Sequence, residues 1–115
     1  RIWFGTRGSG VRISPPRPLL EIKMKYDNMA DLRLELNKID SSLLSLFKDR
    51  FNLIHEASII KKNTNEIRDY ERIEEVISGI RAQSEELGLD PNSMEYLWRF
   101  LIELSIRYEI DHFDD

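Results

Sequence analysis

Residues 28–62 read NMADLRLELNKIDSSLLSLFKDRFNLIHEASIIKK, and this stretch decides the fold that the sequence predicts. It contains neither glycine nor proline, and its apolar side chains recur every three or four residues, the spacing of one face of an α-helix. Asn28 can cap the start of this helix, and a turn that begins at Asn63 breaks it after about Lys62. The apolar seam consists of Leu32, Leu36, Ile39, Leu43, Leu46, Leu53, Ala57 and Ile60.

Two shorter helices are expected to follow the long one. The second begins at about Asp69 and ends at Gly88, because glycine readily adopts the left-handed conformation that closes many helices. Asp90 caps the third, and Pro91 stands at its first position, where a missing N–H is tolerated. The inward-facing residues should be Ile73, Val76, Ile77, Ile80 and Leu87 on the second helix, and Met94, Leu97, Trp98, Leu101, Ile102 and Leu104 on the third. Strand signals are absent, so the predicted fold class is all-α.

The first helix is too long for a lone domain of this size. It would span ~50 Å at 1.5 Å per residue, and two shorter helices cannot cover its whole seam. A homodimer in which two long helices pair, with the short helices wrapped around them, buries the seam economically. The alternative is a monomeric three-helix bundle with a frayed first helix. We expect the intertwined helical homodimer.

Composition narrows the classes of protein that the sequence can represent. The 115 residues suit one small domain, and the lack of cysteine excludes a disulfide scaffold, a thiol nucleophile and a cysteine-ligated zinc site. The two histidines, His55 and His112, lie far apart in the sequence without the spacing of metal ligands. No apolar run is long enough for a transmembrane helix. We therefore expect a cytoplasmic protein without metal, cofactor or membrane association.

The net charge of the chain changes sign near residue 23. Residues 1–23 carry five basic side chains and one acidic side chain, a net charge of +4, together with three glycines and three prolines. The remainder holds 12 basic and 20 acidic side chains, a net charge of −8, which argues against nucleic-acid binding because phosphate contacts need a basic face. We interpret residues 1–23 as a leader, vector-derived rather than an organelle transit peptide. The native start would be Met24 or Met29, and residues 24–115 would form the functional domain.

Two cations interrupt the apolar seam of the first helix. Arg50 stands where the next inward residue is due, and Lys61, eleven residues later, points within about 20° of the same direction at 100° per residue. An unpaired buried cation is costly, so an anion should meet this pair, either an acidic side chain or an anionic ligand. Arg33 is rotated about 100° from Arg50, so it reaches the same pocket more easily across an antiparallel helix pair than within its own chain.

The two shorter helices add four polar residues of interest. Asp69 and Arg72 share a face at the start of the second helix, where a surface ion pair is the plainest interpretation. Ser105 and Glu109 continue the apolar stripe of the third helix at helical spacing. The alternative for these two is that the helix end emerges into solvent, which suits Glu109 better than Ser105.

The order and spacing of these positions resemble the all-helical class of chorismate mutases, in the form of a stand-alone bacterial-type domain. No single piece is specific, whereas the full set with its spacings is. The matching positions are Leu32-Arg33, Ile39-Asp40, Leu43-Leu44, Arg50, Lys61, Asp69, Arg72, Gly88-Leu89-Asp90 and Ser105, which cover about residues 30–110. The resemblance implies an intertwined homodimer with shared active sites, and the isomerisation of chorismate to prephenate in aromatic amino acid biosynthesis (the shikimate pathway).

The resemblance also implies roles for the cations. Each active site is completed by an arginine from the other subunit, and Arg33 is the residue in that position. Arg50 and Arg72 would hold the two substrate carboxylates. Lys61 would contact a carboxylate and the ether oxygen of the breaking bond.

Three polar residues would complete the site on the same resemblance. Glu109 would address the ether oxygen from the side opposite the lysine. Ser105 would contact a carboxylate or the ring edge, and Asp69 the region of the ring hydroxyl. The rearrangement is pericyclic, so positioning and fixed charges are sufficient without a nucleophile, a metal or a redox cofactor.

Two positions depart from the family's pattern. Glu109 stands where a glutamine commonly donates a hydrogen bond to the ether oxygen, and a carboxylate must be protonated to do the same.

Ile73 stands where the run Asp-x-x-Arg-Glu has a glutamate that meets the ring hydroxyl. An apolar residue there resembles isochorismate-pyruvate lyase, which makes salicylate, and also suits a 4-amino-4-deoxychorismate mutase. The retained Asp69 favours the ordinary mutase. A non-catalytic helical interaction module is the alternative from a different class of protein.

Overall fold

The computed structural model describes residues 25–113, which form three α-helices and one short 3₁₀ helix and no strand. The elements in chain order are α1 (Met29–Ile60), η2 (Thr64–Glu66), α2 (Tyr70–Leu87) and α3 (Pro91–His112). The predicted all-α fold class is therefore confirmed for the described residues. Residues 1–23, interpreted above as a leader, lie outside the described part of the chain.

Local capping interactions fix the helix ends close to where the sequence predicts them. Asn28, Asp69 and Asp90 each precede a helix and accept a hydrogen bond from the backbone N–H three residues on, at 2.9–3.2 Å. Such caps satisfy N–H groups that have no partner within the helix. Gly88 ends α2 with a φ of 77°, in the left-handed region that a side chain would strain.

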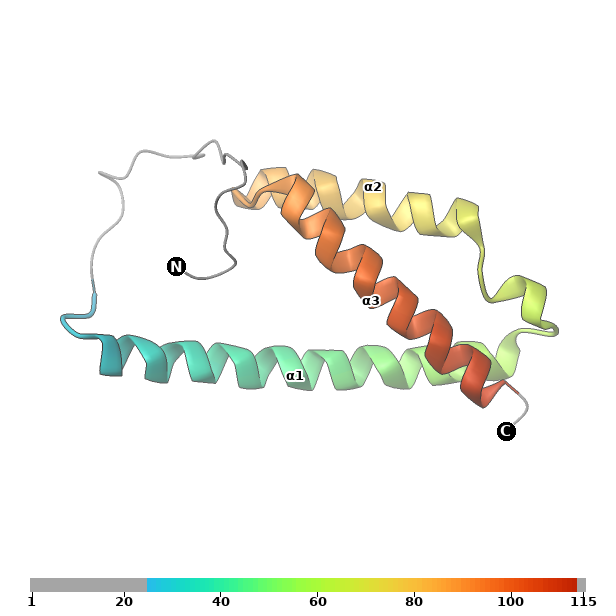
Figure 1. The fold of residues 1–115 in the computed structure, drawn as a ribbon, viewed down its shortest axis with the longest axis horizontal. Helices are drawn as coiled ribbons and strands as arrows, with labels where there is room; N and C mark the ends of the chain where they lie inside the picture. Colours follow the sequence, from blue (N-terminus) through green and yellow to red (C-terminus); the bar gives the residue numbers. More distant parts are fainter. Residues whose placement is uncertain (1–24, 114–115) are drawn as a thin grey trace.

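The third helix holds the molecule together. It packs against both α2 and α1, and it crosses obliquely from the Gly88 turn to the C-terminal half of α1 (Figure 1). A core of buried isoleucines joins α3 to α2 and to the residue after η2, with Trp98 and Phe113 packed around it. The buried isoleucines are Ile67, Ile77, Ile102 and Ile106.

The N-terminal half of α1 lies outside this core and extends beyond the other helices (Figure 1). Leu36 is 50% exposed, Ile39 56% and Leu46 62%. The seam that the sequence predicts to be buried is therefore largely left uncovered by residues 25–113. Near the other end of the same helix, Leu53 and Ile60 are also exposed.

The apolar stripes of α2 and α3 are buried only in part. Ile77, Leu101 and Ile102 are buried as predicted, whereas Leu87 and Leu97 are exposed. None of the described helices combines the length and apolarity needed to cross a membrane.

Candidate active site

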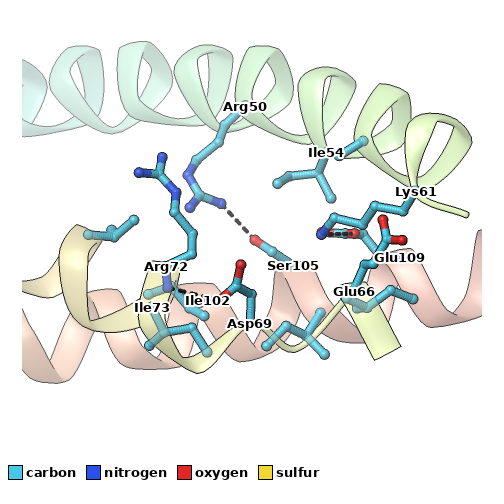
Figure 2. Close-up of a pocket in the computed structure, with 14 residues that line it drawn as sticks. Arg50, Ile54, Lys61, Glu66, Asp69, Arg72, Ile73, Ile102, Ser105 and Glu109 are labelled. Atoms are coloured by element: carbon cyan, nitrogen blue, oxygen red, sulfur yellow. Dashed lines mark hydrogen bonds and ion pairs between the residues drawn. The ribbon is translucent and has the colours of Figure 1, made fainter. Parts of the chain in front are cut away.

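A pocket of about 370 Å³ lies between the C-terminal half of α1, the start of α2 and the C-terminal half of α3. It contains seven of the eight site residues that the sequence predicts, and Figure 2 shows them converging from the three helices. The polar lining residues are Arg50, Lys61, Glu66, Asp69, Arg72, Ser105 and Glu109. The apolar lining residues are Ile54, Ala57, Ile67, Ile73, Val76, Ile102 and Ile106.

Arg33 is the predicted site residue that this pocket does not include. It is exposed on the N-terminal half of α1, ~25 Å along the helix from Arg50 at 1.5 Å per residue. The donation of Arg33 to the site of a second chain stays a prediction.

Arg50 is a partly buried cation without an ion pair among residues 25–113. Its Nη1 donates to the Ser105 hydroxyl at 2.6 Å, and that hydroxyl donates in turn to the Leu101 carbonyl at 2.9 Å. Burial lowers the pKa of the Arg50 guanidinium, because desolvation disfavours its charge. The group nevertheless stays charged, so it presents an uncompensated positive charge to the pocket.

Lys61 and Glu109 form an ion pair across the other end of the pocket. The distance from Nζ to Oε1 is 2.7 Å, and the two side chains are 25% and 5% exposed. An internal ion pair, which the sequence left as an alternative for the buried cations, is therefore what Lys61 makes. Glu109 does not emerge into solvent at the helix end, because the pocket and Lys61 enclose it.

The carboxylate of Asp69 and the guanidinium of Arg72 do not form the predicted ion pair. Asp69 Oδ1 accepts a hydrogen bond from the Arg72 backbone N–H at 3.1 Å, because Asp69 caps α2. The Arg72 guanidinium instead donates to Glu75 at 3.1 Å, through side chains that are 65% and 70% exposed. An exposed pair of this kind is weak, so Arg72 can exchange it for a ligand at little cost.

Glu66 is a pocket residue that the sequence interpretation missed. It belongs to η2, and its carboxylate accepts hydrogen bonds from the Lys62 backbone N–H at 3.3 Å and from the Asn63 amide at 3.5 Å. The pattern Asn63-x-x-Glu66, a capped turn with an acidic residue three positions on, was the available signal. Ile54 was also missed, although it lies one turn after Arg50 on the same face of α1.

The fold and the pocket together define a class of protein: an all-helical domain in which cations from two helices face a hydroxyl and a carboxyl from a third. The sequence model of the family described as chorismate mutase type II matches residues 32–110, from α1 to the last turns of α3. The chain belongs to this family, which confirms the resemblance noted from the sequence. No curated protein matches the chain.

The buried ion pair leads to a stability prediction. Lys61→Met should lower the free energy of unfolding by about 2 kcal/mol at neutral pH, because it leaves Glu109 buried without a countercharge. Urea denaturation at neutral pH measures this loss.

Lys38→Met is the matched control, because Lys38 and Glu35 form an exposed pair on the same helix. Equal losses in the two variants would contradict a special role for burial at Lys61.

Proposed function

We propose that the protein is a chorismate mutase that converts chorismate to prephenate. The observation that carries the proposal is Arg50, a partly buried cation held by a neutral hydroxyl in a pocket between three helices. Such a group favours an anionic ligand, because no described carboxylate compensates it. Membership of the chorismate mutase type II family supports a dicarboxylate of the chorismate type.

The two ends of the pocket suit two parts of this substrate. Arg50 and Arg72 extend toward the same end, where we place the substrate carboxylates (Figure 2). Lys61 and Glu109 lie at the other end, where we place the ether oxygen. Ser105 lies between them and fixes the direction of the Arg50 guanidinium.

The reaction breaks the ether C–O bond while a C–C bond forms, so no atom enters or leaves the substrate. Negative charge grows on the ether oxygen as the C–O bond lengthens. The Lys61 ammonium can donate to this oxygen, and a protonated Glu109 can donate from α3. The residues at the carboxylate end hold the compact conformer in which the two reacting carbons meet.

The charge of the pocket supports a site that a second chain completes. Its lining has three cations and three acidic side chains, so it is neutral when all are ionised. A dicarboxylate would therefore bring two uncompensated negative charges into a partly closed space. The arrival of the partner's Arg33 would offset one of them.

A second copy of the chain accounts for the exposed seam of α1. The residues Leu32, Leu36, Ile39, Leu43 and Leu46 point within about 40° of the direction of Arg50 at 100° per residue. The face that lines the pocket thus continues as an exposed apolar stripe, which a second α1 can cover. If two antiparallel α1 helices overlap along their full length, Arg33 stands level with Glu56, between Arg50 and Lys61.

Ile73 supports a second candidate function within the same family. It lines the pocket where the family's pattern has a glutamate, so the pocket lacks that contact to a ring hydroxyl. An isochorismate-pyruvate lyase or a 4-amino-4-deoxychorismate mutase is compatible with this apolar wall. Asp69 also lines the pocket and can accept from a hydroxyl, which favours chorismate.

The substrate is tested with purified protein given chorismate, isochorismate or 4-amino-4-deoxychorismate in separate reactions. Prephenate from chorismate supports the proposal, whereas salicylate with pyruvate from isochorismate supports the lyase. Arg50→Gln should lower kcat/KM by at least about 100-fold, since one preorganised charge is lost. Arg107→Gln, an exposed arginine of α3, is the control. No turnover of any of the three, and no binding of a bicyclic transition-state analogue, would favour a non-catalytic interaction module.

The sharing of Arg33 predicts complementation between two inactive variants. Arg33→Ala and Arg50→Ala should each be nearly inactive alone. In a hybrid dimer one site has both arginines and the other has neither, so random mixing should restore about one quarter of wild-type activity. The measurement is the rate of chorismate consumption after co-refolding the two variants in equal amounts. Without recovery in dimers shown to be hybrid, Arg33 does not act across the interface.

Glu109→Gln tests the hydrogen bond to the ether oxygen. An ionised carboxylate can only accept hydrogen bonds, whereas an amide can donate one, so Glu109→Gln should raise kcat at neutral pH. The measurement is kcat and KM for both proteins under the same conditions. An unchanged or lower kcat in Glu109→Gln would contradict this role.

A further inference from the structure

A cluster of aromatic side chains lies behind the pocket, where α3 ends on α1. The Tyr108 hydroxyl is 3.3 Å from His55 Nδ1, and the Tyr108 ring stacks on that of His112 with centroids 4.0 Å apart. The rings of His55 and His112 meet edge to face at 5.9 Å, and Phe51 packs against Tyr108 at 5.7 Å. Neither the family match nor the roles proposed above use this cluster.

The aromatic cluster and the Lys61 end of the pocket lie on either side of the same residue of α1. Ser58 is the most deeply buried described residue of α1, at 1% exposure, and α3 is the helix that packs on α1. His55 precedes Ser58 by three residues and Lys61 follows it by three, so they flank it at about 60° on either side of α1. Two consecutive residues of α3 reach these flanks, with Tyr108 near His55 and Glu109 at Lys61.

Rotation of α3 about its own axis would move both residues together. The Lys61 ion pair holds Glu109 in place. In the proposed reaction Lys61 turns to the substrate, and Glu109 loses its only described side-chain partner. The contact between Tyr108 and His55 on the opposite flank then resists the rotation.

His112 stiffens the same turn of the helix. Because the carbonyl of Tyr108 can only accept, His112 Nδ1 carries a proton and donates to it at 2.9 Å. This bond spans residues 108–112, which include Glu109, near the helix end where carbonyl groups lack partners. The hydrogen bond from His112 and the stacking of its ring on Tyr108 therefore stabilise the last turn of α3 in addition to the backbone hydrogen bonds.

We propose that Tyr108 is a positioning residue for Glu109. The contact of the Tyr108 hydroxyl with His55 fixes the orientation of α3 about its own axis during catalysis. The kinetic consequence rests on the proposed mutase activity, whereas the positional consequence does not. The proposal assigns no contact between Tyr108 and the substrate.

The kinetic test removes only the hydroxyl. Tyr108→Phe should lower kcat by about tenfold with KM unchanged, because the ether oxygen then meets a poorly placed Glu109 while the carboxylate contacts persist. Tyr96→Phe is the matched control, since Tyr96 is 80% exposed on the same helix. His55→Leu removes the contact from the α1 side and should reproduce the loss.

A double-mutant comparison separates positioning from a general structural role. In a Glu109→Ala background, Tyr108→Phe should have no further effect on kcat, because the residue through which it acts is gone. An equal fold-loss in both backgrounds would overturn the proposal.

The positional test needs no turnover. In a Lys61→Met background, where no ion pair holds Glu109, the side-chain carboxyl ¹³C chemical shift of Glu109 should change on adding Tyr108→Phe and stay constant on adding Tyr96→Phe. A shift that is the same in all three proteins would overturn the proposal, whatever the substrate. Absence of turnover in the wild type together with the expected shift would contradict the proposed function alone.

Discussion

The crossing of α3 over the C-terminal half of α1 is the contact on which the rest of the structure depends. Two short hydrogen bonds bracket it, from Arg50 to Ser105 at 2.6 Å and from Lys61 to Glu109 at 2.7 Å. In each case a cation of the long helix meets an acceptor of α3. Among the described helices α3 is the one that packs on α1, so the contact that attaches α1 also builds the pocket. The small residue Ser58 is the most deeply buried described residue of α1.

Two of the three pocket cations form ion pairs with described residues. Lys61 is paired with a buried carboxylate and Arg72 with an exposed one, while Arg50 has a hydroxyl alone. The cations therefore differ in how readily each exchanges its partner for a ligand. An anion gains most from Arg50 and loses little at Arg72, whereas at Lys61 it must compete with Glu109. This ranking follows from burial, not from the number of charges.

Features that depend on a single helix were predictable from the sequence. Asn28 and Gly88 mark helix ends because capping is local, and Arg50 and Lys61 share a face because a straight helix fixes their directions. Features that depend on how helices cross were not. Glu66 reaches the pocket through the path of a short turn, and the partners of Tyr108 and Arg72 are set by tertiary packing. The seam of α1 was recognised as apolar, but its burial needs a surface that residues 25–113 do not provide.

If two copies of the chain pair through the exposed stripe on α1, the stability of the fold depends on protein concentration. In the proposed dimer much of the apolar area of α1 leaves water only when two chains meet, so folding and assembly become one equilibrium. The unfolding midpoint then rises with protein concentration, and dilution favours the unfolded chain. A single substitution near the middle of α1 would appear twice in each interface, once from each copy. Selection would therefore constrain this stretch more strongly, and substitutions there would accumulate more slowly than on the exposed face of α3.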